Sequence, residues 1–313
     1  MTLRPSNVTI PAMGPGDPRI GNLLGRALSR MEDADCVIVG FPVDEGVRRN
    51  AGRPGAALGP DAIRRCLFKM TPDARQFEAS VHFLERAADL GDLEPTGDLE
   101  ADQVALGTVL APYLSRGATV VVLGGGHETS FGHYLGYACA GRNVQVLNWD
   151  AHPDVRPLLD GKGHSGSPFR QMLLHDLKSC AGYAVAGLNA HNTSKEHVDF
   201  LAERGALAVF SDAVSAVKVQ ELIWSLRTNA FVTFDLDALP QSIAPGVSAP
   251  NADGISLDIW LLAAELAGVN SAVRSIDIVE LCPPLDKDDQ TARVAALTIW
   301  RFWRGRCSAR ART

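Results

Sequence analysis

Short runs of β-branched and apolar residues recur along most of this chain, with helical patterns between them. The runs are apolar at consecutive positions rather than at every second one, which indicates strands buried on both faces. Strands of this kind form parallel sheets, whose connecting helices must cover both faces. The runs that we interpret as strands are Cys36–Val43, Ala118–Leu123, Val144–Trp149, Tyr183–Leu188, Leu207–Phe210, Ala230–Leu236 and Val273–Val279.

Glycines mark the predicted ends of several intervening helices, because glycine readily leaves the helical conformation. Ser256 also suits an N-cap position, where its hydroxyl can accept a backbone N–H. The three clearest helices, each with the glycine that follows it, are Asp102–Ser115 before Gly117, Ser194–Arg204 before Gly205, and Ser256–Ala267 before Gly268.

No repeat, low-complexity segment or linker divides the chain. We therefore predict an α/β fold: a single three-layer α/β/α domain over residues 1–313, with a doubly wound, mainly parallel sheet of about eight strands. The Pro- and Gly-rich residues 1–30 are expected to be partly mobile, and residues 305–313 to form a basic tail. We interpret the arginines of 301–313 as a helix end or a subunit contact.

Charge and cysteine use narrow the cellular setting. A net charge of −6 argues against general nucleic-acid affinity, which needs a clustered basic face. The opening residues contain no apolar run long enough for a signal peptide, and no later run approaches the length of a membrane span. The six cysteines have no Cys-x-x-Cys spacing, which favours a reducing compartment. We therefore predict a cytoplasmic protein with no nucleic-acid or membrane partner.

Polar residues stand at the ends of several predicted strands. In open parallel sheets, ligands bind just beyond the C-terminal ends of the strands, so these positions are the first candidates for a functional site. The candidate positions are Gly124–Glu128, Asp150–Asp154, Asp235–Asp237 and Glu280.

The first two groups combine imidazole and carboxylate ligands. The glycines before His127 permit a tight turn and close backbone approach, and a neutral imidazole is a common metal ligand. Asp150, His152 and Asp154 would point the same way in an extended segment, because side chains alternate faces at a period of two. The structural alternatives are a hydrogen-bonded histidine and an Asp-rich turn around Pro153.

Asp235 and Asp237 place two more carboxylates at a two-residue spacing after an apolar run. Buried acids a few ångström apart must be protonated, pair with cations or bind metal, and no lysine or arginine adjoins these two in sequence. An aspartate that caps a turn is the structural alternative. Together with the two histidines, the four aspartates suit two divalent ions, and this oxygen-rich chemistry favours Mn²⁺. Paired ions of this kind can activate water for hydrolysis.

These motifs have counterparts in a known family. GGGHE at 124–128, DAHPD at 150–154 and DLDALP at 235–240 resemble the ureohydrolases, the arginase and agmatinase superfamily. The segments GRPG at 52–55, GPDAIR at 59–64 and SIDIVE at 275–280 are similar to that family as well. The resemblance therefore covers most of the chain.

The resemblance implies an arginase-like fold with two Mn²⁺ ions per subunit, bridged by Asp150 and Asp235. It also implies a homo-oligomer, as a trimer or a hexamer. The ligands that the resemblance adds to the bridging pair are His127 and Asp154 for one ion, and His152 and Asp237 for the other.

Within the superfamily, this chain is most similar to the formimidoylglutamases of histidine degradation. GGGHE stands where arginases and agmatinases usually have GGDHS, and DVR at 154–156, SGSPFRQ at 165–171 and APGVSAP at 244–250 are similar to the formimidoylglutamase branch. This likeness implies hydrolysis of N-formimidoyl-L-glutamate to L-glutamate and formamide, by attack of a metal-bridging hydroxide. Agmatinase, guanidinobutyrase and arginase activities are the alternatives, and a non-catalytic metal-binding relative is a more distant one.

The resemblance also implies roles for individual side chains around the metal ligand Asp150. The family position of Glu280 anchors the amidinium or guanidinium end of the substrate; a surface acid is the alternative. His164 is the candidate proton shuttle, because imidazole titrates near neutral pH; a solvated loop histidine is the alternative. The two substrate carboxylates call for arginines; a structural salt bridge is the alternative for each arginine. The candidate arginines are Arg156, Arg170, Arg53 and Arg48.

Two other enzyme classes fit the sequence less well. GHSGS at 163–167 nearly matches the nucleophile elbow of serine hydrolases, but Ser167 replaces its final glycine and no plausible strand precedes it. The glycines of 124–126 suggest a dinucleotide-binding loop, but Thr129 stands where the last glycine of that motif belongs.

Overall fold

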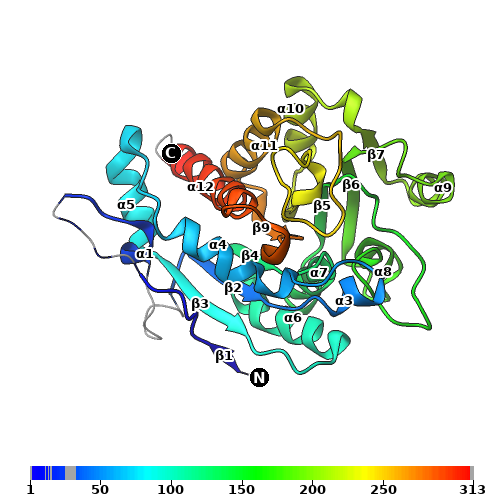
Figure 1. Ribbon diagram of the computed structural model, residues 1–313, viewed down its shortest axis with the longest axis horizontal. Coiled ribbons are helices and arrows are strands. Elements are labelled where there is room, and N and C mark those ends of the chain that lie inside the picture. Colours follow the sequence, from blue (N-terminus) through cyan, green and yellow to red (C-terminus); the bar gives the residue numbers. More distant parts are fainter. Residues whose placement is uncertain (1, 11, 13, 15, 25–32, 311–313) are drawn as a thin grey trace.

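The computed structural model describes residues 2–10, 12, 14, 16–24 and 33–310 of the chain. Within these residues, nine strands form one sheet with helices on both faces (Figure 1). The strands are β1 Leu3–Arg4, β2 Cys36–Phe41, β3 Ala87–Leu93, β4 Thr119–Gly124, β5 Val144–Trp149, β6 Cys180–Leu188, β7 Leu207–Phe210, β8 Ala230–Asp235 and β9 Val273–Val279.

The sheet is mainly parallel, in the strand order β1-β3-β2-β4-β9-β8-β5-β6-β7. The short edge strand β1 pairs antiparallel with β3, and the other neighbouring strands pair in parallel. The strands β4, β9, β8 and β5 are successive neighbours at its centre, so their C-terminal ends meet at one edge. The predicted three-layer α/β/α architecture is confirmed.

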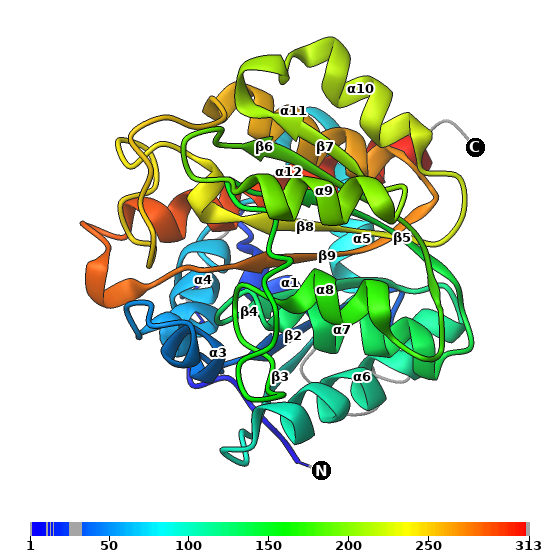
Figure 2. The ribbon, with the colours of Figure 1, turned by 90° about the vertical axis from the view of Figure 1, so that its right-hand side faces the viewer.

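Helices cover both faces of the sheet. The helices α4, α5, α10, α11 and α12 contact one another in series on one face, and α6, α7 and α8 do so on the other (Figures 1 and 2). None of the helices in the described part of the chain has the length and apolar character that crossing a membrane requires. The helices are α1 Ile20–Leu23, α3 Glu45–Arg49, α4 Gly59–Leu67, α5 Phe77–Glu85, α6 Leu99–Ser115, α7 Thr129–Cys139, α8 Pro168–Leu174, α9 Lys195–Glu203, α10 Ala216–Ser225, α11 Leu257–Val269 and α12 Gln290–Arg310.

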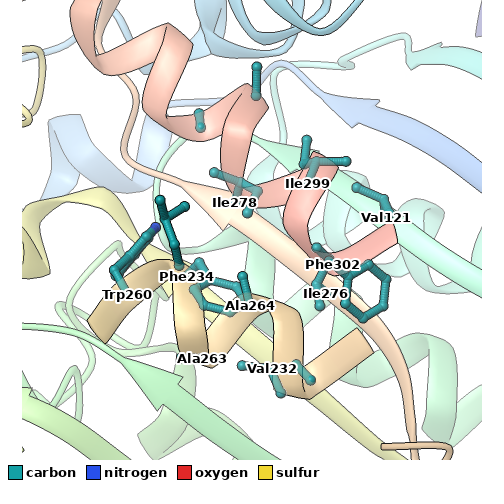
Figure 3. Close-up of a cluster of buried hydrophobic side chains, with 14 of the residues drawn as sticks. Val121, Val232, Phe234, Trp260, Ala263, Ala264, Ile276, Ile278, Ile299 and Phe302 are labelled. Carbon is teal, nitrogen blue, oxygen red and sulfur yellow. The ribbon is translucent and has the colours of Figure 1, made fainter. Parts of the chain in front are cut away.

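The larger hydrophobic core lies between the central strands and the helices α11 and α12 (Figure 3). The Phe234 ring of β8 packs edge-on against the Trp260 ring of α11, with ring centroids 5.1 Å apart. Ile276 of β9 belongs to the same buried cluster as Ile299 and Phe302 of α12. Full burial of side chains of this size contributes about 1.5–3 kcal/mol each, so this core holds the central strands in place.

The strand β3 is the main element that the sequence did not predict, because Asp89 and Asp92 interrupt its apolar pattern. Both carboxylates are buried, and both accept hydrogen bonds from the buried guanidinium of Arg64 on α4. The Arg64 Nη2 atom lies 2.9 Å from Asp89 Oδ1. A buried charge is tolerated when it is paired and hydrogen-bonded, so this cluster lets two acids stand inside a strand.

Gly268 does not end α11 as predicted, since the helix continues to Val269. The glycine instead permits close packing of α11 on α12. A Cβ atom at Gly268 would lie 2.0 Å from the carbonyl oxygen of Phe302, and one at Gly305 would lie 2.1 Å from that of Glu265. The two helices therefore meet at a crossing that has room only for glycine.

The two ends of the chain differ in part from expectation. The predicted basic tail of 305–313 begins inside α12, and its last three residues lie outside the described residues. Within α12, Arg301 and Arg304 pair with Glu265 of α11, with N–O distances of 2.8 and 2.9 Å. The predicted mobile segment 1–30 contains β1 and α1, and residues 1, 11, 13, 15 and 25–30 of it lie outside the described residues.

The helix crossing can be tested with Gly268→Ala. The added methyl group has no room beside the Phe302 carbonyl, so we expect the free energy of unfolding to fall by about 1–3 kcal/mol in urea denaturation. Gly182→Ala is the matched control, because a Cβ atom there would lie no closer than 3.9 Å to its nearest neighbour, Gln145. Equal stability of the two variants would contradict this account of the crossing.

Candidate metal centre

All six predicted metal ligands converge at the C-terminal edge of the central strands. They form two groups, and within each group the ligand atoms lie within 4.8 Å of one another. Asp150 belongs to both groups, as expected of a bridging residue, whereas the bridging role of Asp235 stays a prediction. The first group is His127, Asp150, Asp154 and Asp235, and the second is Asp150, His152 and Asp237.

The distances between ligand atoms match the spacing around a small divalent cation. His127 Nδ1 lies 2.9 Å from an oxygen of Asp235, 3.0 Å from one of Asp154 and 3.3 Å from one of Asp150. His152 Nδ1 lies 3.1 Å from an oxygen of Asp237. Neighbouring ligands that each stand about 2.1 Å from one octahedral ion are about 3 Å apart.

Two turns of the same kind bring the ligand pairs together. Asp150 Oδ1 accepts the backbone N–H of His152 at 2.7 Å, and Asp235 Oδ1 accepts that of Asp237 at 2.9 Å. Such turns, in which an aspartate bonds the amide two residues on, fold the chain back on itself. The segment after β5 is therefore bent, and the extended conformation that the sequence suggested is wrong, although its ligands do converge.

The glycine-rich loop fixes the position of His127. Gly125 is required by close backbone approach, because a Cβ atom there would lie 1.8 Å from the carbonyl oxygen of Val43. The backbone N–H of Glu280 donates to the Gly125 carbonyl at 2.8 Å, and Glu280 Oε1 accepts the backbone N–H of His127 at 2.8 Å. The ends of β4 and β9 are thereby tied together at the centre.

Two residues at the site have strained backbone conformations. Asp154 and Glu280 have φ angles of 46° and 67°, in the left-handed region that residues other than glycine rarely adopt. Strained residues of this kind cluster at functional sites, where the surrounding structure holds them. Both side chains line one cavity beside the ligand groups.

Buried polar atoms show that the cluster fits a cation. Asp237 Oδ1 is buried without a hydrogen-bond partner among the described residues. His127 Nδ1 is buried too, and it faces three carboxylate oxygens without a well-formed hydrogen bond to any of them. An unpaired buried polar group costs about 1–3 kcal/mol, and a divalent cation between the imidazoles and the carboxylates would satisfy both atoms. The donor set of two imidazoles and four carboxylates suits a hard or borderline ion such as Mn²⁺.

The imidazoles and the acids perturb one another strongly. Burial alone would lower the pKa of His127, but the carboxylates of Asp150, Asp154 and Asp235 around it raise that pKa well above its ordinary value. Attraction to Asp237 raises the pKa of His152 to about 12. Burial, and then repulsion from neighbouring acids, raises the pKa of Asp235. Without metal, protons therefore supply the positive charge that the carboxylates need.

Two adjoining cavities lead to the cluster. The inner one, of about 340 Å³, is lined by Asp235, Asp237 and Glu280, and the outer one, of about 630 Å³, by His164 and His197. The residues that line both cavities are Asn50, Ala51, His152, Asp154 and Arg156.

Of the predicted arginines, Arg156 alone lines both cavities among the described residues; its Nη1 atom donates to Asn50 at 3.2 Å. Arg53 lines the inner cavity, where its guanidinium donates to two backbone carbonyls. Arg170 lines neither; its guanidinium lies 4.2 Å from the centre of the Phe200 ring. Arg48 pairs with Asp44. Arg156 is thus the candidate best placed for a ligand.

His164 lines the outer cavity, but both of its ring nitrogens contact the loop backbone. Nε2 lies 2.9 Å from the carbonyl oxygen of Pro157, and Nδ1 accepts the backbone N–H of Gly166 at 3.2 Å. These bonds give the ring a structural role in its loop. Its role as a proton shuttle stays a prediction.

Two polar residues near the ligands were missed in the sequence. Asn148 Nδ2 donates to Asp150 Oδ2 at 3.0 Å, and Thr233 Oγ1 lies 3.0 Å from His127 Nε2. Each stands two positions before a ligand aspartate and has apolar neighbours on both sides in its strand. Because alternate residues of a strand share a face, that spacing is the signal that could have found them.

Binding of divalent cations such as Mn²⁺ should release protons. His127 and His152 have raised pKa values and hold protons at neutral pH without metal, whereas metal binding needs neutral imidazoles. We therefore expect the solution to acidify on titration of metal-free protein in weak buffer, and the apparent affinity to rise with pH. His152→Ala should release fewer protons, and an affinity that does not change with pH would contradict this expectation.

Comparison with known proteins agrees with this geometry. The formimidoylglutamase of Nocardia farcinica is 38% identical over 280 residues, which cover 87% of this chain and 86% of that protein. The formimidoylglutamase of Salmonella newport is 39% identical over 276 residues, covering 85% of each chain. A crystal structure of Trypanosoma cruzi formiminoglutamase with Mn²⁺ superposes with a TM-score of 0.85 at 32% identity, covering 93% of this chain and 99% of that one.

The sequence profile of one family, described as the Arginase family, matches residues 34–303. The matched region contains every strand from β2 to β9 and all six candidate ligands. The chain therefore belongs to the arginase family.

Proposed function

We propose that this chain is a dimanganese hydrolase that converts N-formimidoyl-L-glutamate and water into L-glutamate and formamide. One observation carries the proposal: two ligand groups that share Asp150 adjoin a cavity that is lined by acids and by Arg156. The likeness to formimidoylglutamases, and to a formiminoglutamase structure with Mn²⁺, supports the same reaction.

The six candidate ligands would hold two Mn²⁺ ions, with Asp150 and Asp235 between them. Paired divalent ions lower the pKa of a bound water and stabilise negative charge that develops during hydrolysis. Asp150 would serve the reaction by holding both ions at once. The proposed ligands are His127, Asp150, Asp154 and Asp235 for one ion, and Asp150, His152, Asp235 and Asp237 for the other.

Glu280 would bind the formimidoyl end of the substrate. Burial, and then repulsion from Glu128 and Asp237, raises the pKa of Glu280 well above its ordinary value. A cationic amidinium beside Glu280 would lower this pKa again. The Glu280 carboxylate would then be ionised and accept a charged hydrogen bond from the amidinium. The acidic inner end of the cavity thus favours the cationic end of the substrate.

Arg156 would bind the glutamate end. Its guanidinium can donate two parallel hydrogen bonds to a carboxylate, and it lines both cavities. The same positive charge would repel the distal ammonium of agmatine. Arg53 and Arg170 are proposed as further substrate contacts, which would require their guanidinium groups to leave the backbone or the ring that they now contact.

Hydrolysis breaks the bond between the formimidoyl carbon and the glutamate nitrogen, and the departing amine must gain a proton. His164 would supply it from the wall of the outer cavity. Delivery would require its ring to give up one of its two backbone hydrogen bonds.

We propose the cytoplasm as the setting and histidine degradation as the pathway. All six cysteines carry free thiols, which suits a reducing compartment. A homo-oligomer, as a trimer or hexamer, stays a prediction that measurement of the molar mass in solution would test.

The substrate can be tested by comparing turnover of formimidoylglutamate, agmatine, arginine and guanidinobutyrate by manganese-loaded protein. We expect formimidoylglutamate to have the highest kcat/KM, with formamide and glutamate formed in equal amounts. Asp150→Asn should abolish turnover and lower the bound manganese. Ser165→Ala should keep activity, because Ser165 Oγ accepts a hydrogen bond from Asn50 and does not serve as a nucleophile. Preferred turnover of agmatine would overturn the proposed substrate.

The role of Arg156 can be tested with Arg156→Met. Loss of a charged hydrogen bond of about 1.5–3 kcal/mol should lower kcat/KM for formimidoylglutamate by about 10- to 150-fold. The discrimination against agmatine should narrow in the same variant. Arg227→Met, at an exposed arginine beyond α10, is the matched control and should behave as the wild type. Unchanged kinetics of Arg156→Met would remove this residue from the proposal.

A further inference from the structure

A set of polar side chains lies buried beneath the metal centre, in layers that are otherwise apolar. On α7, Ser130 and His133 stand three residues apart, a spacing that places them on one face of the helix. They contact the central strands at Thr233 of β8 and Asp277 of β9, which are paired neighbours in the sheet. Each of the four side chains is at most 1% exposed.

These side chains form a continuous path to one metal ligand. His127 Nε2 lies 3.0 Å from Thr233 Oγ1, which lies 3.2 Å from Ser130 Oγ. Ser130 Oγ donates to Asp277 Oδ2 at 3.1 Å. We name His127, Thr233, Ser130 and Asp277 the buried relay. Three hydrogen bonds thus connect the imidazole at the metal centre to a carboxylate in the core.

The direction of every hydrogen in the buried relay is set by its two ends. At one end, His127 Nδ1 faces the ligand carboxylates, where the proposed ion would lie. An imidazole that binds metal through Nδ1 carries its hydrogen on Nε2, so His127 would donate to Thr233. At the other end, a carboxylate only accepts, so Ser130 donates to Asp277. A hydroxyl has one hydrogen, and Thr233 must therefore donate to Ser130. The path runs in one direction, from the ligand to the carboxylate.

His133 holds the end of the buried relay in place. Its Nδ1 lies 2.8 Å from Asp277 Oδ2, the oxygen that also accepts from Ser130, and its Nε2 lies 2.6 Å from Ser275 Oγ. The ring is stacked on Phe231, with centroids 4.2 Å apart. The carboxylate is therefore fixed from two sides and cannot turn away from Ser130.

We propose that Asp277 is a positioning residue of the metal centre, which acts through Ser130 and Thr233 to hold His127 in the orientation and tautomer that bind metal. The inference rests on the proposed role of His127 as a metal ligand. Metal-binding histidines commonly donate their second N–H to a carboxylate, which fixes the ring and increases its basicity. Here two hydroxyls extend that link to a carboxylate in the next strand.

A purely structural polar cluster would predict a different result. Removing one of its groups would destabilise the fold, but the affinity for metal would change little. Tyr137 provides that comparison, because its buried hydroxyl contacts Ser275 at 2.7 Å and lies outside the buried relay. Tyr137→Phe removes a buried hydroxyl of the same network without breaking the path to His127.

The test is Mn²⁺ affinity, measured by the paramagnetic resonance of free Mn²⁺ during titration of metal-free protein, beside urea unfolding of each metal-free variant. Thr233→Val and Ser130→Ala interrupt the buried relay, and Asp277→Asn removes its charge. We expect each to weaken binding of one Mn²⁺ by about 10- to 100-fold, as loss of such partners usually does. Thr233→Ser, which keeps the hydroxyl, should retain the affinity.

The controls separate the possible outcomes. Tyr137→Phe should lose stability and bind Mn²⁺ as the wild type does. Wild-type affinity in Thr233→Val, Ser130→Ala and Asp277→Asn, or an equal loss in Tyr137→Phe, would overturn the inference and leave the metal centre standing. Failure of the wild type itself to bind two Mn²⁺ would overturn the proposed metal centre and the inference with it.

Discussion

The structure depends on one electrostatic constraint: four aspartates share a buried site and cannot all be ionised there without compensating positive charge. The site meets this constraint in two ways, through the protons on His127 and His152 and through its capacity for divalent cations. Hydrophobic burial builds the sheet that carries the acids. The repulsion among them, and the cations that relieve it, determine the chemistry of the sheet edge.

The fold supplies these acids from strands that are far apart in the sequence. The central order β4-β9-β8-β5 places four strand ends side by side, so that His127, Asp150, Asp235 and Glu280 can meet. Packing of α11 and α12 on one face, through a crossing that admits only glycine, keeps β8 and β9 close beneath them. The position of the ligands is therefore set by the apolar core.

Much of this could be predicted from the sequence, because buried parallel strands and their polar ends have clear patterns. β5, β7 and β9 have the expected bounds, and all six ligands converge. β3 was missed because Arg64, which neutralises Asp89 and Asp92, lies on a distant helix. The sequence could not show which arginine is best placed to bind a substrate carboxylate. Only tertiary contacts show that the Arg170 guanidinium packs on the Phe200 ring while Arg156 lines the cavities. The partners of Asp277 could not be predicted either, because Ser130 and His133 lie on α7 and come close to it only in the folded chain.

The two aspartate turns have a consequence for how the site takes up ions. In Asp150 and in Asp235, one carboxylate oxygen accepts a hydrogen bond from a backbone N–H of the same turn. The other oxygen faces His127. Each carboxylate is therefore restrained by its own turn even where no ion holds it. These ligands lose their conformational freedom when the chain folds rather than when an ion binds. The six ligands therefore form a preorganised cage for the ions. A cage of this kind would need no local refolding when an ion enters or leaves it.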